Sequence, residues 1–545
     1  MHLRLSRFRA CLAFLALLPL VPARADDSAG DRLGRVHFEV TGQPAAREHV
    51  VRGVKLLHHM MYPEADRAFA AALTADPSCA LGYWGRAMTL LHPLWPDAPT
   101  ATELREGEAL LKQGLALPPA TPRERAYLET LARYFVGAQP EQHVERLKAL
   151  DEAASAQADA YPEDLDAEAL AALFHLAPAR FQPKDTSHRI QIRAAERLQR
   201  VLAALPDHPG AQHYKIHAYD FPMLADRALE VCEDYGAIAP EVPHALHMPS
   251  HIYTRRGQWE KSVDFNRRSA EAARQLMAKD REVNSHLPHA LDYMVYAYCQ
   301  QGRFARAEQA RHEMLALKGP YSPVQRAAMA FAFAAIPARC ALERQRWEEA
   351  AALPVRAPAG FSWGDAFLNC DSITRFARAL GAARSGRLQQ ARRETAALET
   401  LLTQLSIGKR AAYWRSQAET QLLAARAWIH RAEGNDAEAI ALMQRAAALE
   451  AQTDKEAVTP GEVLPAGELL GDLLLECDRP AEALAAYQAV DANSPNRLNT
   501  LYGAGVAARK AGQPDLARTY FQRLLEITRD ADPGLPQVQE ARRHL

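Results

Sequence analysis

Residues 46–79, AREHVVRGVKLLHHMMYPEADRAFAAALTADPSC, decide the fold. They form two amphipathic helical patterns joined by a turn at Tyr62 and followed by a proline. Small and large apolar residues alternate at fixed places: Gly53, Ala65, Phe69, Ala72 and Pro77. Small residues let two helices approach closely where they cross, and large ones fill the space beside the crossing. The stretch therefore predicts a helix-turn-helix unit.

The same arrangement recurs elsewhere in the chain. The 34-residue unit length is that of the tetratricopeptide repeat, which pairs two helices and ends in a proline. Three later units place equivalent residues at Leu423, Ala427, Ala439, Met443 and Ala446, at Gly471, Leu474, Ala483, Tyr487 and Pro495, and at Leu501, Gly505, Ala508, Ala517 and Phe521. Strand signals are nearly absent. We predict an all-α fold: a tetratricopeptide-repeat solenoid, or helix-turn-helix superhelix, of roughly nine or ten repeats.

The first residues predict a cleaved signal peptide. A basic start with Arg4, Arg7 and Arg9 precedes a short apolar run, and Ala23-Arg24-Ala25 follows it. This is the order of a secretory signal with its cleavage site. We expect residues 1–25 to be removed and the mature protein to be periplasmic or secreted.

Proline- and glycine-rich stretches predict breaks in the array. The two longest cover residues 352–371 and 452–467, and shorter ones cover 89–100 and 181–187. We therefore predict an N-terminal array over residues 26–355 and a C-terminal array over residues 356–545.

Net charge and hydropathy argue against nucleic acid as a partner and against a membrane span. The net charge is −1, whereas a nucleic-acid binder has a basic excess. No segment after residue 25 is apolar enough to predict a membrane span. Six scattered cysteines follow the signal, without C-x-x-C spacing, and we expect buried thiols rather than disulfides.

The most informative region is rich in histidine. It contains HPGAQHYKIHAYD at residues 208–220 and HALHMPSHIY at residues 244–253. In the repeat register, His213 and His217 occupy positions 5 and 9, and His247 and His251 occupy the same positions one repeat later. Each pair lies one helical turn apart on the face that lines the concave groove. His244 and His289 fall at position 2 of their units, and Asp292 and Tyr296 at positions 5 and 9 of the third.

Two interpretations of these residues remain open. Imidazoles on adjacent helices can share one metal ion, and neutral imidazole suits zinc or copper. In that case His213, His217, His247 and His251 converge on one ion, supported by His244, His289, Asp292 and Tyr296. Alternatively, the same side chains contact a peptide, protein or small ligand in the groove. The sequence fixes no cofactor.

Catalytic signals are absent. No G-x-S-x-G, H-E-x-x-H or glycine-rich phosphate loop occurs, so we assign no catalytic residue and expect a binding protein rather than an enzyme. His58 and His92 share position 13 and offer a weaker groove site. Glu468 and Asp472 are interpreted as a solvated acidic face.

Five segments also carry a family resemblance: LLHHMMYPEADRAF (56–69), DPSCALGYWGRAM (76–88), HPGAQHYKIHAYD (208–220), HALHMPSHIYTRRGQW (244–259) and HALDYMVYAYCQQGRF (289–304). With them the sequence resembles a widespread family of exported bacterial tetratricopeptide-repeat proteins without an established activity. The resemblance covers most of residues 36–310. It implies the solenoid fold and a shared histidine-rich centre, but no reaction and no partner. The leading hypothesis is therefore an exported scaffold that holds a ligand in its groove, and the alternative is a metal-binding protein or metalloenzyme.

Overall fold

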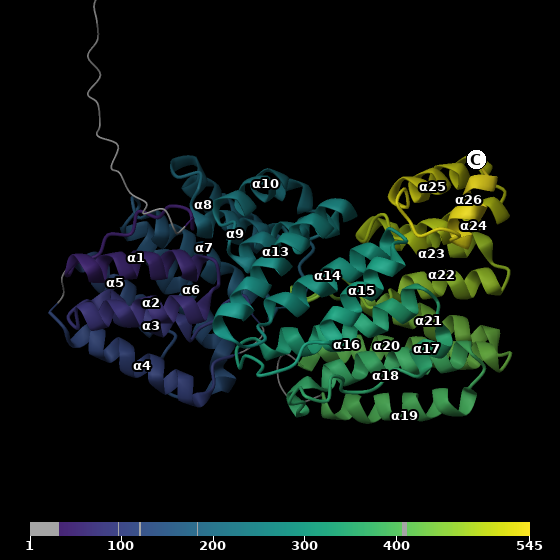
Figure 1. Ribbon diagram of the computed structural model, residues 1–545, viewed down its shortest axis with the longest axis horizontal. Helices are drawn as coiled ribbons and strands as arrows, with labels where there is room; N and C mark the ends of the chain where they lie inside the picture. Colours follow the sequence, from purple (N-terminus) through teal and green to yellow (C-terminus); the bar gives the residue numbers. More distant parts are fainter. Residues whose placement is uncertain (1–31, 96–97, 119–120, 183, 406–410) are drawn as a thin grey trace, which may run out of the picture. The chain divides into compact units, whose positions relative to one another are not determined.

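The computed structural model describes residues 32–95, 98–118, 121–182, 184–405 and 411–545 (Figure 1). The predicted signal peptide, residues 1–25, lies outside them. Over the described residues the chain is all-helical, and its one β-type contact is an isolated bridge between Val283 and Tyr321. The predicted all-α fold is confirmed.

The helices follow one another as antiparallel hairpins joined by short turns. Those of the first part are α1 (Pro44–His58), α2 (Tyr62–Ala75), α3 (Ala80–Thr89), α4 (Ala101–Ala116), α5 (Pro122–Ala132), α6 (His143–Ala160), α7 (Leu165–Ala179), α8 (Arg189–Ala204), α9 (Pro209–Tyr219), α10 (Leu229–Ile238), α11 (Pro243–His247), α12 (Pro249–Arg255) and α13 (Trp259–Asp280). Short 3₁₀ turns precede α6 (η1, Pro140–Gln142) and α10 (η2, Ala225–Ala228).

The second part continues in the same manner. Its helices are α14 (His286–Gln300), α15 (Phe304–Leu315), α16 (Arg326–Glu343), α17 (Trp347–Ala351), α18 (Leu368–Arg384), α19 (Leu388–Gln404), α20 (Ala411–Ala432), α21 (Asp436–Glu450), α22 (Ala466–Glu476), α23 (Pro480–Asn493), α24 (Leu498–Lys510), α25 (Pro514–Ile527) and α26 (Pro536–Arg543). One 3₁₀ turn, η3 (Asp365–Phe367), precedes α18.

Glycine against an aromatic ring is the packing unit that the repeat pattern predicts. A Cβ on Gly53 of α1 would lie 2.6 Å from Phe69 of α2, and one on Gly85 of α3 would lie 2.2 Å from the same ring. A fully buried Phe69 is thus held between two glycines on neighbouring helices. Any side chain at either glycine would collide with the Phe69 ring, so only glycine lets the helices pack this closely. The contacts therefore match the small and large positions that the repeat pattern predicts.

The buried apolar residues form two clusters that meet along α13. One runs from Leu33 to Phe265 and the other from Trp259 to Ala541. Residues 33–545 nevertheless form one compact unit. The division into arrays at residue 355 therefore stays a prediction.

The predicted breaks are the long non-helical connections. Residues 352–364 separate α17 from η3, and residues 451–465 separate α21 from α22. We call residues 452–465 the covering segment, because they lie against the histidine-rich helices described below.

The acidic face predicted at Glu468 and Asp472 is wrong. Glu468 is 1% exposed and forms an ion pair with the buried Arg497, with Nε to Oε2 at 3.0 Å. Asp472 accepts a hydrogen bond from Tyr487 at 2.6 Å, and burial raises its pKa to about 7. The repeat pattern places both residues on the groove-facing side of the helix. It does not reveal that other residues of the chain, Arg497 and Tyr487, contact them there.

The six cysteines that follow the predicted signal are unpaired, and all but Cys477 are buried. Among the described residues, no helix combines the length and apolarity needed to cross a membrane.

Candidate metal centre

Three successive hairpins supply the histidines, each from its first helix. His213 and His217 lie on α9, His244 and His247 on α11, His251 on α12, and His286 and His289 on α14. Pro249 starts α12, yet Met248 between α11 and α12 keeps helical angles (φ −54°, ψ −41°). His247 and His251 therefore stay one turn apart on one face, as the repeat register predicts.

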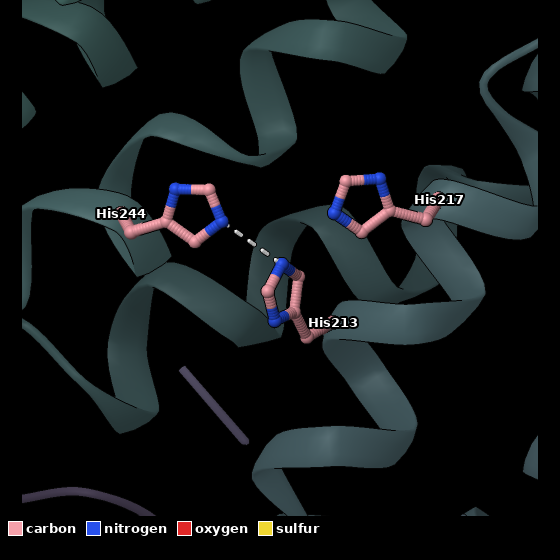
Figure 2. A group of neighbouring side chains, drawn as sticks. All are labelled: His213, His217 and His244. Atoms are coloured by element: carbon pink, nitrogen blue, oxygen red, sulfur yellow. Dashed lines mark hydrogen bonds between the residues drawn. The ribbon is translucent and has the colours of Figure 1, made fainter. Parts of the chain in front are cut away.

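The first histidine group brings together His213, His217 and His244. One ring nitrogen from each lies within 4.8 Å of the other two. Figure 2 shows the three rings directed toward one another from two helices, with Nε2 of His213 and Nε2 of His244 only 3.1 Å apart. We call this group the first triad.

The second triad consists of His247, His251 and His289, with ring nitrogens again within 4.8 Å of one another. Nε2 of His247 and Nε2 of His251 lie 2.9 Å apart. The ring centroids of His247 and His289 are 4.3 Å apart. Each triad thus joins the position 5 and 9 histidines of one repeat to the position 2 histidine of the next.

This grouping corrects the expectation of one four-histidine site. The ring nitrogens of His213 and His217 group with His244, and those of His247 and His251 group with His289, instead of all four gathering at one point. His244 and His289, expected as supports, are full members of the triads. The two triads are still neighbours: ring centroids of His217 and His251 lie 6.1 Å apart.

In three of the rings, the Nδ1 nitrogen donates a hydrogen bond that fixes the orientation of the ring. Nδ1 of His251 donates to Asp220 Oδ2 at 2.9 Å, and Nδ1 of His213 donates to the His58 carbonyl at 2.7 Å. Nδ1 of His247 donates to Asn266 Oδ1 at 2.7 Å. The Asn266 amide is itself oriented because its Nδ2 donates to the Ser262 carbonyl at 2.8 Å. Because these acceptors hold a proton on Nδ1, each Nε2 of a neutral ring carries a lone pair.

The second triad therefore holds two lone pairs face to face. Neither His247 Nε2 nor His251 Nε2 has a proton to offer across the 2.9 Å between them. The hydroxyl of Tyr293 lies 3.4 Å from His251 Nε2, but its single proton has a nearer acceptor in the Thr459 carbonyl at 3.2 Å. Two facing lone pairs repel, and a cation between them removes the repulsion.

Burial disfavours a proton as that cation, because it lowers the pKa of the imidazoles. Burial, together with the neighbouring imidazoles, lowers the pKa of His247 and His289 well below the usual value. Burial also lowers the pKa of His213 to about 3. The His251 pKa is lowered by burial too, although Asp220 opposes the shift. Neutral imidazoles are the form that coordinates a metal.

The other two predicted supports have different partners. Asp292 is fully buried and forms an ion pair with Arg339 at 3.0 Å. Tyr296 accepts a hydrogen bond from Arg497 Nη1 at 2.9 Å. Both residues contact buried arginines instead of the triads.

The covering segment occupies the inner face beside the triads. Tyr293 donates toward the Ala457 and Thr459 carbonyls, and Lys455 Nζ lies 3.1 Å from Asp220 Oδ2. Arg339 donates to the Gly461 and Glu462 carbonyls at 2.8 and 2.6 Å. The irregular backbone of the covering segment therefore lies against α14 and Arg339 of α16.

A third group, His58, Asp166 and His208, is a hydrogen-bonded network. His208 Nδ1 accepts from the Ala211 amide, so its Nε2 carries the proton that faces Asp166 at 3.3 Å. His58 bonds Asp166 at 2.9 Å and Tyr214 at 3.0 Å. Burial raises the Asp166 pKa, but both histidines outweigh it and lower that pKa overall. His58 therefore does not line a groove site, and His92 packs its ring at 4.2 Å from that of Tyr62.

The orienting residues were missed from the sequence. Asp220 stands at the end of the quoted stretch 208–220, but Asn266 lies on α13 and has no spacing signal. The triads could have been found by combining positions 5 and 9 with position 2 of the following repeat.

No protein-family model matches the sequence, and no curated protein matches it either. Among solved structures, the chain is similar to one in the crystal structure of the APC/C hetero-tetramer Cut9-Hcn1, with 13% identity and a TM-score of 0.33. That match covers 94% of this chain and 78% of the other. It is also similar to the human IFIT1 dimer with m7Gppp-AAAA, with 13% identity and a TM-score of 0.37 over 90% of this chain and 91% of the other. Neither similarity bears on function.

Proposed function

We propose that this helical-repeat protein binds transition-metal ions at two neighbouring three-histidine sites. Zinc and copper are the metals that suit the imidazole ligands best. The observation that supports this most strongly is the pair of lone pairs on His247 and His251, which face each other at 2.9 Å while both far nitrogens are committed to Asn266 and Asp220.

The ligand number favours an open site over a closed structural one. Structural zinc sites use four protein ligands, whereas reactive zinc sites use three and leave one position free. Each triad offers three histidines. The proposal therefore includes an exchangeable position at each metal, without assigning a reaction.

Metal content tests this function directly. The chain is purified without a histidine tag, loaded with zinc, desalted and measured by mass spectrometry of the elements. The expected result is two ions per chain, one for each triad. His247→Gln/His251→Gln removes one ion and His213→Gln/His217→Gln removes the other, while the exposed His312→Ala retains both. Zinc content near zero in the folded unmodified chain overturns the proposal.

A second candidate is protein or peptide binding, the leading hypothesis from the sequence. It is supported by the covering segment, a non-helical stretch whose backbone carbonyls accept hydrogen bonds from Tyr293 and Arg339. A variant in which residues 452–465 are replaced by a glycine-serine linker of the same length should bind a labelled peptide of residues 452–465 added separately, because the linker lacks the Lys455 and Glu456 side chains that anchor the native segment. No binding by the folded variant rules out this candidate.

Export is also a proposal. It is supported by the signal pattern of residues 1–25 and by the family resemblance of residues 36–310. Intact mass of the protein from periplasmic extract should correspond to a chain that starts at Asp26. Recovery of the protein only from the cytoplasmic fraction, with a mass that includes Met1, contradicts export.

A further inference from the structure

A cavity adjoins the first triad. Its volume is about 380 Å³, and its wall includes His217 of that triad and Asp220, which orients His251. The end of α7, the start of α8, the end of α9 and residues 452–457 of the covering segment enclose it. Small-molecule sites have volumes of about 300–1,000 Å³, so this cavity has the size of a binding site.

Three buried polar atoms on side chains of the cavity wall have no hydrogen-bond partner among the described residues. They are Arg180 Nη1, His188 Nδ1 and Gln191 Oε1. A fourth, His217 Nε2, belongs to a ring of the first triad, so the proposed metal accounts for it. A buried donor or acceptor without a partner costs free energy, and such atoms are rare in native proteins. Their gathering around one cavity indicates a polar ligand.

The cavity wall contains hydrogen-bond donors on two cationic side chains. Arg180 pairs with Glu456 through Nη2, which leaves its Nη1 free. Lys455 uses Asp220 as an acceptor, and its side chain is only 2% exposed. An ammonium has three protons, so Lys455 keeps donors for a ligand. A guanidinium and an ammonium together suit a carboxylate.

With a divalent ion at the first triad, the charge balance of the cavity favours one negative charge on the ligand. Besides Arg180 and Lys455, the wall contains Lys184, and it contains four carboxylates: Asp185, Asp220, Asp454 and Glu456. Three cations against four anions leave one excess negative charge in the wall. A divalent ion bound to His217 would reverse the sign and leave room for one anion.

The rest of the wall is apolar. Leu94, Leu176, Phe181, Ile190 and Phe221 contribute to it. An apolar body attached to the charged group would gain from burial there, at about 25 cal/mol per Å² of apolar surface.

We propose that this cavity binds a small organic monocarboxylate, with its carboxylate toward Arg180, Lys455 and the first triad and its apolar body against Leu176 and Phe221. The direct contribution of the metal rests on the proposed function. The arginine, the lysine and the apolar wall belong to the cavity itself.

Hexanoate is the probe, and hexanol is its neutral control of the same length. Titration calorimetry of the zinc-loaded chain should show hexanoate binding at one site and no saturable binding of hexanol. Equal binding of both compounds overturns the proposal, since the carboxylate would then contribute nothing. No hexanoate binding overturns it as well.

Two variants locate the site. Arg180→Gln should weaken hexanoate binding about tenfold or more, because it removes a charge-assisted hydrogen bond. Arg256→Gln removes a more exposed arginine from an ion pair with Asp226 and should leave affinity unchanged. Ile190→Trp fills the cavity from α8 without touching an ion pair and should abolish binding. Hexanoate affinity that survives both Arg180→Gln and Ile190→Trp overturns the assignment.

The same titration separates the two proposals. A chain that binds zinc but not hexanoate retains the metal sites and loses the carboxylate site. A chain that binds hexanoate without binding zinc retains the carboxylate site and loses the proposed function.

Discussion

At the scale of single residues, one carboxylate connects the second triad to its surroundings. Asp220 accepts from His251 Nδ1 and Arg255 Nε through different oxygens and also contacts Lys455. Its pKa is raised by burial, but Lys455, Arg255 and His251 outweigh that and hold it well below the usual range. Asp220 therefore stays ionised and fixes the His251 ring with Nε2 toward the second triad.

Asp220→Asn should weaken zinc binding at the second triad about 10- to 100-fold, the usual effect of removing a partner that orients a metal ligand. Competition with a chromophoric chelator measures this affinity. Asp226→Asn, at an exposed ion pair with Arg256, is the matched control and should change nothing. Equal affinity of the Asp220→Asn and unmodified chains contradicts the assigned role.

The sequence predicted the histidines of the triads better than it predicted the residues that orient them. Residue spacing placed His213, His217, His247 and His251 correctly on successive helices, because helical periodicity is local. It did not pair them with His244 and His289 as triads, because that depends on how far one hairpin is displaced from the next. Asn266 and the His58 carbonyl come from other helices and leave no trace in spacing.

At the scale of helices, glycine–aromatic contacts set the separation of the hairpins. Tyr487 of α23 lies between Gly471 of α22 and Gly503 of α24, where an added Cβ would come within 2.5 and 2.3 Å of its ring. Phe69 lies between Gly53 and Gly85 in the same way. The repeat pattern predicted the glycine and aromatic positions within each hairpin, Gly53 with Phe69 and Gly471 with Tyr487. It did not single out Gly85 and Gly503, the glycines of the following helices.

Gly471→Ala should destabilise the protein by about 1–3 kcal/mol through overpacking, although alanine is intrinsically the better helix former by about 1 kcal/mol. Urea unfolding followed by circular dichroism measures the change. Tyr487→Leu should reduce that penalty when combined with Gly471→Ala. Thr400→Ala on the exposed face of α19 is the control and should be neutral or stabilising. A stabilised Gly471→Ala variant contradicts the contact.

The covering segment is held by a buried arginine. Arg339 pairs with Asp292 and donates to carbonyls of residues 461 and 462. Burial raises the Asp292 pKa, and Arg339 opposes that shift. The sequence predicted the non-helical stretch but not where in the fold it lies. Its contacts with Arg339 join residues more than a hundred positions apart, which spacing along the chain does not reveal.

Arg339→Leu should cost about 3–5 kcal/mol of unfolding free energy, since it leaves a buried carboxylate without its partner. Arg344→Leu, at a partly exposed ion pair with Glu308, should cost no more than about 1 kcal/mol. Limited proteolysis should also cut the first variant within residues 452–465 sooner. Equal stability of the two variants would show that Arg339 does not hold the segment.

At the scale of the whole molecule, buried neutral histidines make stability depend on pH. Burial is the largest influence on His59 and His213, and it lowers the pKa of each to about 3. In the unfolded chain a histidine has a pKa of about 6.5. The unfolded state therefore binds more protons between these values, and stability falls as the pH drops below about 6.5.

Each such histidine approaches a loss of about 1.4 kcal/mol per pH unit well below pH 6.5, and His59 and His213 together remove about 2.4 kcal/mol between pH 6 and pH 5. Urea midpoints of the chelator-treated protein measure the slope without bound metal. A midpoint that stays constant from pH 7 to pH 5 contradicts the buried, neutral state of these rings.

The position of bound metal tests the central claim most directly. Crystals of the tag-free chain grown with zinc give an anomalous difference map at the zinc absorption edge. Two peaks are expected, one surrounded by His213, His217 and His244 and the other by His247, His251 and His289, each about 2.0–2.1 Å from the ligating nitrogens. A map with no peak at either triad, from protein that diffracts and is folded, contradicts the account.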